Sequence, residues 1–173
     1  MKLVVVSDTH GDRAILEAIL RQQPGAAGYF YAGDSELAAA DPLFDTFRAV
    51  AGNMDFDPDF PLTVSATIQG LTVFETHGHR FGVNFGLGQL IEAAQAAKAQ
   101  VALFGHTHQL GCEVHDGILL VNPGSISQPR GQFASLRGTY AVIDVTEAAF
   151  TVTYYLRDGQ PAPGLQRRFT RQR

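Results

Sequence analysis

The chain has 173 residues, of which 45% are hydrophobic, and its 13 Lys and Arg against 17 Asp and Glu give a formal net charge of -4. This length and composition predict a single globular domain, residues 1–173, with a sizeable hydrophobic core. The acidic balance gives no general attraction to nucleic acid or to an anionic membrane surface, so we expect a small substrate and no stable nucleic-acid binding.

The sequence predicts neither a membrane span nor a secretory signal. Its longest apolar runs, such as Leu3–Val6 and Val101–Phe104, fall well short of the about 20 residues that cross a bilayer. We therefore expect a cytoplasmic protein, and a homo-oligomer stays open. Cys112 is the only cysteine, which excludes an intrachain disulfide and a cysteine-based zinc site. Any metal ligands must then be oxygen and nitrogen atoms.

Apolar runs in the first third of the chain predict strands at Leu3–Ser7, Gly28–Ala32 and Arg48–Ala51. Between the first two, apolar residues recur at i, i+1, i+4 and i+5 from Ile15, which predicts an amphipathic helix with Asp12 as its N-cap. This order is typical of a βαβ unit whose helix packs on a parallel sheet.

The middle of the chain predicts a hairpin, a helix and a buried strand. Leu62–Gln69 and Leu71–Thr76 flank Gly70 and have the pattern of paired strands. The Ala-rich segment Gly88–Gln100 predicts a helix. Val101–Phe104, which follows it, reads as a buried strand.

The last third is rich in predicted strands. Gly111–His115 and Ile118–Val121 flank an Asp-Gly turn, and Thr139–Asp144 and Thr151–Leu156 form a further alternating pair. We expect the basic stretch Arg167–Arg173 to be a solvated, frayed tail. A parallel first half and an antiparallel second half suggest two sheets packed face to face, with helices on the outside.

Residues able to bind metal follow the carboxyl ends of the predicted strands, where open α/β sheets place their sites. They fall in five short segments: Asp8 and His10; Asp34; Asn53 and Asp55; His77 and His79; His106 and His108. Taken alone, each is more often a turn or surface residue. The ordered set at successive strand ends favours a metal site.

The spacing and the donor atoms both fit this interpretation. The i, i+2 spacing of Asp8 and His10, and of His106 and His108, points both side chains of a pair into one volume if the backbone is extended. Carboxylate and amide oxygens with imidazole nitrogens suit Mn, Fe or Zn. A carboxylate that bridges two such cations places them about 3.5–4 Å apart, an arrangement suited to hydrolysing a phosphate ester.

Glycines stand directly beside these candidates at positions 33, 52, 78 and 105. Any one of them can be an ordinary turn glycine. Because all four adjoin ligand-type residues, we expect them to allow unusual backbone dihedral angles and close approach to the site.

The sequence resembles the calcineurin-like metallophosphoesterase superfamily, and within it the small bacterial and archaeal phosphodiesterases of the YfcE type. The resemblance covers about residues 1–145 and extends to the loop Asn122–Ser125. It rests on five motifs in order: Asp8-Thr9-His10, Gly33-Asp34, Gly52-Asn53-Met54-Asp55, Thr76-His77-Gly78-His79 and Gly105-His106-Thr107-His108. The fold that it implies is a four-layer α/β/β/α sandwich, in agreement with the two sheets expected from the pattern.

The resemblance also implies two divalent cations per chain, with Mn expected and Fe, Ni or Zn as alternatives. The ligands it implies are Asp8, His10 and His108 for one metal, Asn53, His77 and His106 for the other, and Asp34 as the bridge. The implied activity is hydrolysis of small phosphodiesters by a hydroxide that bridges the two cations, without a covalent enzyme intermediate.

One residue departs from the family pattern. Many superfamily members carry a histidine after the asparagine, where it can contact the phosphate or protonate the leaving oxygen. Met54 stands there instead, and a thioether can do neither. His79 is the candidate substitute, although a supporting role fits it equally well. Asp55 is a further catalytic candidate, and the sequence favours a structural role for it.

Two other functions stay open at this point. A phosphomonoesterase of the same fold is the nearest enzymatic alternative. A non-catalytic protein-binding scaffold, like the retromer subunit of this fold, is the other, and the complete set of seven ligand-type residues favours catalysis over it. Arg13, Arg80 and Arg130 could contact a substrate phosphate, with plain surface arginines as the default.

Overall fold

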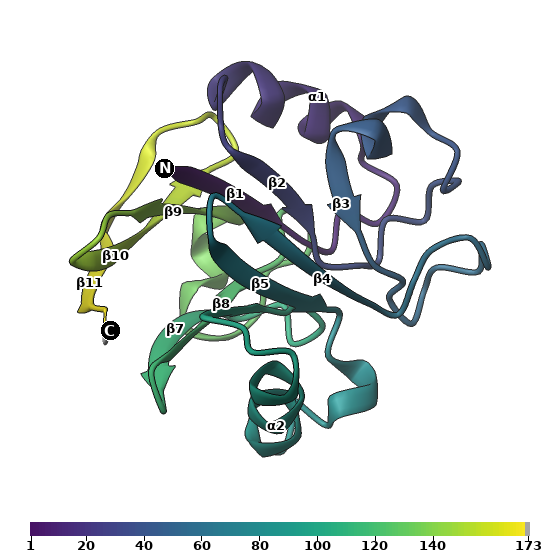
Figure 1. Ribbon diagram of the computed structural model, residues 1–173. Coiled ribbons are helices and arrows are strands. Elements are labelled where there is room, and N and C mark those ends of the chain that lie inside the picture. The colour runs from purple at the N-terminus through teal and green to yellow at the C-terminus, as the bar shows by residue number, and fades with distance from the viewer. Residues whose placement is uncertain (172–173) are drawn as a thin grey trace.

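The computed structural model describes residues 1–171 and shows two β-sheets packed face to face, with a helix against each outer face (Figure 1). The first sheet has the spatial order β11 (Pro161–Thr170), β10 (Ala149–Leu156), β9 (Thr139–Val145), β1 (Lys2–Val6), β2 (Gly28–Tyr31) and β3 (Phe47–Ala49). The second has the order β4 (Thr63–Ile68), β5 (Leu71–Thr76), β6 (Val101–Leu103), β8 (Ile118–Pro123) and β7 (Leu110–His115). The predicted four-layer α/β/β/α sandwich is confirmed.

The two sheets do not divide the chain as the sequence suggests. In the first sheet β1, β2 and β3 are parallel, and β9, β10 and β11 extend it with antiparallel pairs. In the second sheet β5, β6 and β8 are parallel, and the edge strands β4 and β7 are antiparallel to their neighbours. The expectation of a parallel first half and an antiparallel second half is therefore wrong. Alternation of side chains predicts a strand but does not identify its partner.

The helices lie where their apolar stripes require. In α1 (Arg13–Gln22), Asp12 accepts a hydrogen bond from the Ile15 N–H (3.3 Å), which confirms the predicted N-cap. Ile15, Leu16 and Ile19 are buried against the outer face of the first sheet. The second helix, α2 (Gly88–Ala96), covers the outer face of the other sheet and ends earlier than predicted.

Three buried clusters hold the layers together. The central one lies between the sheets and includes Leu3 and Val5 of β1 with Val73, Leu103 and Leu119 of the second sheet. The other two lie under α1 and α2. Short 3₁₀ turns lie in three of the connections between these elements: η1 (Pro42–Asp45), η2 (His79–Phe81) and η3 (Gly131–Leu136). Burial between the sheets thus fixes how far apart their strand ends lie.

The C-terminal prediction is wrong over most of its length. Arg167 and Arg168 lie in β11. This strand pairs antiparallel with β10, and Thr170 lies opposite Ala149 at one end of the pairing. Partly buried apolar residues of β11, among them Leu165 and Phe169, pack on the core. The free energy gained from this packing outweighs the tendency of the arginines to keep the segment in solvent. Residues 172–173 of the predicted tail lie outside the described residues.

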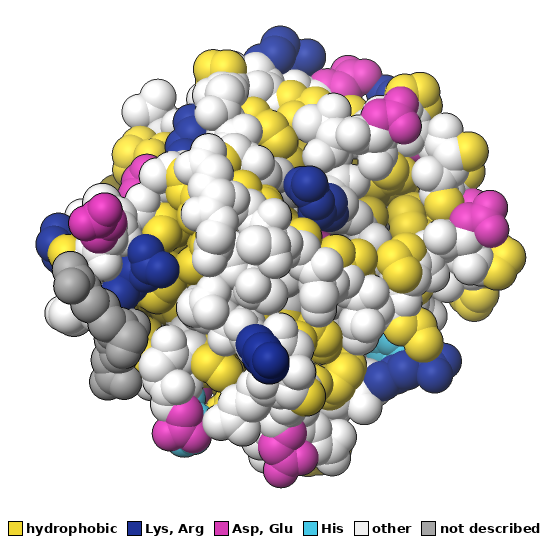
Figure 2. All heavy atoms as spheres, in the orientation of Figure 1, with side chains coloured by type: hydrophobic (Ala, Val, Ile, Leu, Met, Phe, Trp, Pro, Cys, Tyr) yellow, Lys and Arg dark blue, Asp and Glu magenta, His cyan; other side chains and the backbone are white. Residues whose placement is uncertain are grey.

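The surface agrees with the modest net charge. On the face that Figure 2 shows, Lys and Arg side chains are separated by other surface and form no continuous basic patch. Among residues 1–171, no helix is long and apolar enough to span a membrane.

Glu75 is an exception to the apolar packing between the sheets. Its side chain is fully buried in β5, and neither carboxylate oxygen has a hydrogen-bond partner among residues 1–171. Burial raises the pKa of Glu75 well above its ordinary value, and the positive charge of the nearby Arg48 offsets only part of this rise. The carboxyl group therefore destabilises the fold once it ionises.

We predict that Glu75→Gln is more stable than wild type at neutral pH. A raised folded-state pKa means that wild type loses stability as pH rises from the unfolded value of about 4.3 through the folded pKa. The difference in unfolding free energy should grow by about 1.4 kcal/mol per pH unit across that window. Urea unfolding of both proteins in chelator at several pH values measures it. A pH-independent difference would contradict the burial of an ionisable carboxyl.

Candidate metal centre

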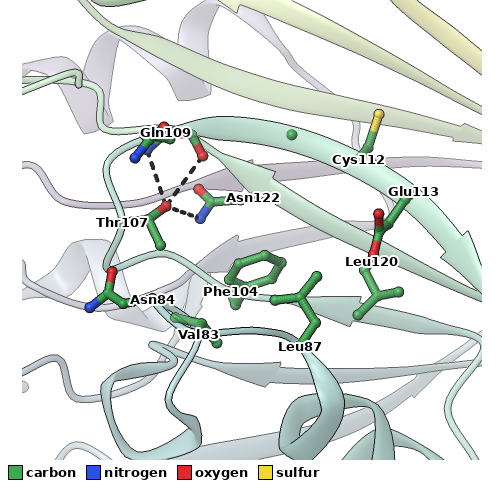
Figure 3. A pocket seen from close by; sticks show the side chains of 11 residues that line it. Val83, Asn84, Leu87, Phe104, Thr107, Gln109, Cys112, Glu113, Leu120 and Asn122 are labelled. Carbon is green, nitrogen blue, oxygen red and sulfur yellow. Dashed lines mark hydrogen bonds between the residues drawn. The ribbon is translucent and has the colours of Figure 1, made fainter. Parts of the chain in front are cut away.

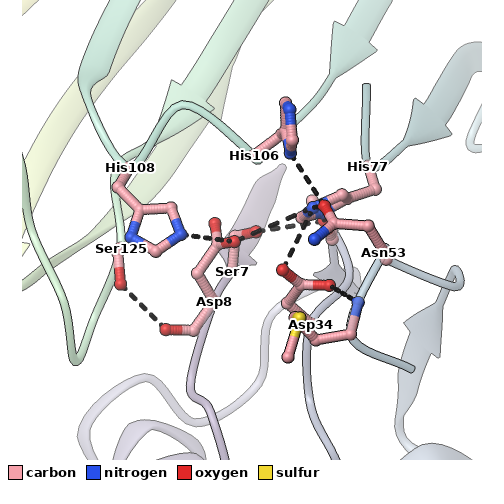
Figure 4. Close-up of polar contacts among 12 residues, drawn as sticks. Ser7, Asp8, Asp34, Asn53, His77, His106, His108 and Ser125 are labelled. Carbon is pink, nitrogen blue, oxygen red and sulfur yellow. Dashed lines mark hydrogen bonds and ion pairs between the residues drawn. The ribbon is translucent and has the colours of Figure 1, made fainter. Parts of the chain in front are cut away.

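The candidate ligands come from loops that follow parallel strands of both sheets. The loops after β1 and β2 run side by side, because the Asp8 N–H donates to the Gly33 carbonyl (3.0 Å) and the His10 N–H donates to the Asp34 carbonyl (3.1 Å). The loop after β8 joins them, since the Ser125 hydroxyl donates to the Asp8 carbonyl (2.8 Å; Figure 4). Backbone hydrogen bonds thus fix these loops relative to one another.

The backbone at the ligands is left-handed rather than extended. Five of the seven candidates have positive φ: Asp8 (57°), His10 (48°), Asp34 (57°), His106 (66°) and His108 (59°). The expectation that an extended backbone points both side chains of each i, i+2 pair into one volume is therefore wrong. The side chains converge because the chain turns sharply at each of these residues, which non-glycine residues do at a cost of about 1–3 kcal/mol each.

Two glycines leave the space that the carboxylates occupy. A Cβ added at Gly52 would lie 2.0 Å from Oδ1 of Asp34 and 2.4 Å from its backbone nitrogen. A Cβ at Gly105 would lie 2.1 Å from the Ser7 hydroxyl and 2.9 Å from Oδ2 of Asp8. Any side chain at either position would have to displace a candidate ligand or its neighbour.

A first cluster brings together Asp8, His10, Asp34 and His108, each with one ligand atom within 4.8 Å of the others. Nε2 of His108 lies 3.3 Å from Oδ1 of Asp8 and 3.4 Å from Nε2 of His10. Asp8 is fully buried, and among residues 1–171 its carboxylate oxygens have no hydrogen-bond partner. A buried carboxylate facing imidazole nitrogens is the environment that a cation stabilises.

A second cluster contains Asn53, His77 and His106. Oδ1 of Asn53 lies 3.1 Å from Nε2 of His77 and 2.9 Å from Nδ1 of His106. The Asn84 side-chain nitrogen lies 2.9 Å from the other ring nitrogen of His106. Figure 4 shows Asn53, His77 and His106 gathered on the side of Asp34 away from His108.

Asp34 lies between the two clusters. Its Oδ2 is 3.4 Å from Nε2 of His77, while its Oδ1 accepts a hydrogen bond from the Met54 N–H (2.7 Å). Burial opposes ionisation of Asp34, but His77 and the Met54 N–H outweigh it and hold the pKa of this carboxyl below its ordinary value. Asp34 is therefore anionic where both clusters can reach it.

Partners outside the clusters orient three of the imidazoles. Nδ1 of His77 donates to the Ala32 carbonyl (2.6 Å), and Nδ1 of His108 donates to the Gln128 carbonyl (2.7 Å). Nδ1 of His10 donates to the Glu36 carboxylate (2.7 Å). These bonds place the proton on Nδ1 and leave Nε2 free for a metal, the arrangement usual for histidine ligands.

The surroundings of the ligands therefore fit divalent metal ions. Burial lowers the pKa of His77, but the carboxylates of Asp34 and Asp8 raise this pKa by more. The protonated imidazole and a metal cation therefore compete for the same negative charge. The donor set contains two carboxylates, four imidazoles and one amide oxygen, without sulfur. Such a set suits Mn, Fe, Ni or Zn.

The two further candidates occupy different positions. The Asp55 carboxylate accepts hydrogen bonds from the N–H groups of Asp34, Ser35, Glu36 and Gly52, which supports the structural role that the sequence favours. His79 stands behind the second cluster, with its ring centroid 5.4 Å from that of His77. Burial and the neighbouring imidazoles lower the pKa of His79.

The three arginines considered for phosphate contact also differ. Arg13 pairs with Asp41 (2.7 Å) and Glu17, so its guanidinium is engaged away from the clusters. Arg80 is exposed and lines a groove together with Asn53 and His79. The Arg130 N–H donates to the His108 carbonyl (2.9 Å), which places this loop beside the first cluster.

Sequence reasoning missed the residues that hold the ligands in place. Glu36 follows Asp34 by two residues and belongs to no motif that points to His10. Asn84 lies in an irregular segment between η2 and α2, and nothing in its neighbourhood in the sequence marks it as a partner of His106. Such contacts depend on loop conformation, which side-chain periodicity does not encode.

The fold and the site are those of the calcineurin-like phosphoesterase class. The model of the calcineurin-like phosphoesterase superfamily domain matches residues 1–148, and the chain belongs to this superfamily. Membership implies divalent metal ions, for which the Asp and His residues above form a candidate site.

Among curated proteins, the chain is 33% identical over 171 residues to a protein named "Probable metallophosphoesterase YsnB" from Bacillus subtilis (strain 168), which covers 98% of this chain and 99% of that protein. It is 29% identical over 158 residues to phosphodiesterase YfcE from Escherichia coli (strain K12), with 76% and 82% covered. The resemblance to the YfcE type is confirmed.

Solved structures agree on the fold. A structure described as a predicted phosphoesterase from Streptococcus pneumoniae TIGR4 superposes with a TM-score of 0.94 at 37% identity, over 98% of this chain and 97% of that one. Vps29 from Chaetomium thermophilum superposes with a TM-score of 0.73 at 19% identity, over 99% of each chain. The second match shows the fold alone.

We predict that Gly52→Ala weakens metal binding by about 10- to 100-fold, the usual effect of disturbing the support of a ligand, because the added methyl group must displace Asp34. Gly111→Ala is the matched control, since a Cβ there meets nothing within 4 Å. Metal content after dialysis against graded chelator measures the effect, with thermal unfolding as a check of folding. Equal metal retention in both variants would contradict the close approach.

Proposed function

We propose that this protein is a metal-dependent phosphodiesterase that hydrolyses small phosphodiesters at a site for two divalent cations. The observation that carries the proposal is the pair of clusters that share Asp34: Asp8, His10 and His108 on one side, and Asn53, His77 and His106 on the other. Mn is the proposed metal, with Fe, Ni and Zn as alternatives.

The chain's own residues supply the positioning. One cation would be held by Asp8, His10 and His108. The other would be held by Asn53, His77 and His106, and Asp34 would contact both cations. When bound, the cations supply an acidified water molecule and neutralise charge on the phosphate oxygens. Because Glu36 and the carbonyls of Ala32 and Gln128 fix the imidazoles before any ligand arrives, little reorganisation is needed on binding.

Two grooves beside the second cluster support a diester over a monoester. One groove is lined by Asn53, His79 and Arg80, and the other begins at Asn84 beside His106. A phosphodiester carries two organic groups and a monoester carries one. Two grooves at one centre therefore favour the diester, and turnover of both substrate classes by the metal-loaded protein tests this preference.

A protein-binding scaffold is the second candidate, because large apolar side chains are exposed close to the site. Phe56 is 86% exposed two residues beyond Met54, and Phe85 is 97% exposed next to Asn84. A scaffold has no need of a complete ligand set, however. The anchored imidazoles and the buried Asp8 carboxylate, which has no hydrogen-bond partner among residues 1–171, favour the enzyme.

We predict two bound cations per chain in protein reconstituted with Mn, Fe, Ni or Zn, and weaker binding at both sites in Asp34→Asn, because one carboxylate serves both clusters. Titration followed by elemental analysis measures this. Asp116→Asn, which removes an exposed carboxylate in the β7–β8 turn, is the control. A wild-type stoichiometry of zero, or loss of only one cation in Asp34→Asn, would show that the shared-ligand proposal is wrong.

We also predict that leaving-group acidity controls the rate in wild type, because the Met54 thioether cannot donate a proton and the lowered pKa of His79 keeps its imidazole neutral at pH 7. General acids typically contribute about 10²–10⁴-fold. Met54→His should therefore accelerate alkyl leaving groups more than nitrophenolate. The Met54 side chain is 41% exposed and its bond to Asp34 uses the backbone, so the variant keeps that bond.

The measurement is turnover of para-nitrophenyl and alkyl phosphodiesters by wild type and Met54→His, with metal occupancy determined in both. If the substitution changes both rates by the same factor, the explanation of Met54 fails.

A further inference from the structure

A groove of about 430 Å³ lies on the outer face of the second sheet, between β7, β8 and the segment that leads into α2 (Figure 3). Its volume is within the range of about 300–1,000 Å³ in which proteins bind small organic molecules. The apolar side chains of Val83, Leu87, Phe104 and Leu120 form one side of it. None of the seven candidate metal ligands lines this groove.

The groove opens beside the second cluster. Asn84 lines it and also lies 2.9 Å from Nε2 of His106. Thr107, the residue between His106 and His108, lines it as well, held by the Asn122 side-chain amide (3.0 Å). A molecule in this groove therefore reaches the edge of the centre where the phosphate would bind.

The groove exists because β7 carries no side chain at one outward position. Along β7, Leu110 and Cys112 pack towards the core between the sheets, so Gly111 and Glu113 face outward. A Cβ at Gly111 would meet nothing within 4 Å, and its φ is not in the left-handed region. The glycine is thus not required by backbone strain or close packing, and its effect is to leave the groove open.

The lining indicates the kind of group that fits. Figure 3 shows the polar side chains of Asn84, Thr107, Gln109 and Asn122 at one end and Glu113 at the other, with the apolar side between them. Among the residues that line the groove, Glu113 alone is charged, so the groove does not attract a second phosphate. Amides above an apolar surface suit a flat, neutral ring with hydrogen-bonding edges.

We propose that this groove binds the retained organic group of the substrate, and that this group is a nucleoside. The proposal rests on the proposed phosphodiesterase function and specifies its substrate class. The base lies on the apolar side of the groove within reach of the amides, and the sugar lies towards Asn84 and the metal centre.

Gly111→Phe fills the groove without touching the metal ligands and tests the proposal. Two substrates share one leaving group: the para-nitrophenyl ester of thymidine monophosphate, and methyl para-nitrophenyl phosphate. We expect Gly111→Phe to lower kcat/KM for the thymidine ester by roughly 10-fold or more, since each factor of 10 corresponds to about 1.4 kcal/mol of lost binding. The methyl ester should be unaffected.

Thr67→Phe is the matched control, because it adds the same ring at an exposed position of β4, the opposite edge of the sheet. It should change neither rate. Gly111→Leu repeats the test if circular dichroism shows that the Phe variant does not fold. An equal fall on both substrates in the Gly111 variants, or no fall on either, would overturn the proposal.

Binding of thymidine alone gives a readout that needs neither metal nor turnover. Saturation-transfer NMR should show thymidine signals with wild type and Thr67→Phe and a loss of them with Gly111→Phe. Thymidine signals that persist in Gly111→Phe would overturn the groove assignment. Failure of metal-loaded wild type to cleave methyl para-nitrophenyl phosphate would instead count against the phosphodiesterase function, and the NMR result would stand separately.

Discussion

The carboxylate of Asp55 makes the hydrogen bonds on which the site depends. It accepts backbone N–H groups from Asp34, Ser35 and Glu36 in the loop after β2, and from Gly52 in the loop after β3. Without this carboxylate, the N–H groups of these two loops would bind water instead, and the loops would move apart. With Asp55 in place, Asp34 and Asn53 are presented from adjacent loops, and Glu36 is held where it orients His10. One acidic side chain therefore organises ligands for both clusters.

The geometry of the site opposes stability. Left-handed backbone at five candidate ligands costs free energy in the folded chain, and so does the buried Asp8 carboxylate, which lacks a hydrogen-bond partner in the described part of the chain. The three apolar clusters and the backbone bonds between loops offset this cost. Strain at ligands is common where a site must be preorganised, because positions that relax freely do not hold charged groups close together. Among residues 1–171, five of the ten non-glycine residues with positive φ are candidate ligands, which supports a functional reading of the strain at the site.

The sequence predicts the elements and the candidate ligands better than it predicts their arrangement. The strands other than β11, the helix after Asp12 and the sandwich fold follow from periodicity and from the resemblance. The pairing of β9 with β1 does not, because alternation is the same whichever strand is the partner. The ligand types at strand ends could be read directly, whereas the left-handed turns at non-glycine residues could not. Glu36 and Asn84 were missed because their partners come from distant segments.

The packing of the two sheets also determines the distance between the candidate ligands. Each cluster draws on both sheets: Asp8 and His10 follow β1 while His108 follows β6, and Asn53 follows β3 while His77 follows β5. No sheet alone could assemble either cluster. The apolar contacts between the sheets therefore set the ligand geometry, in addition to stabilising the fold. This dependence explains how a site built on short, strained loops can be held in place: its loops are brief extensions of strands whose separation the core fixes.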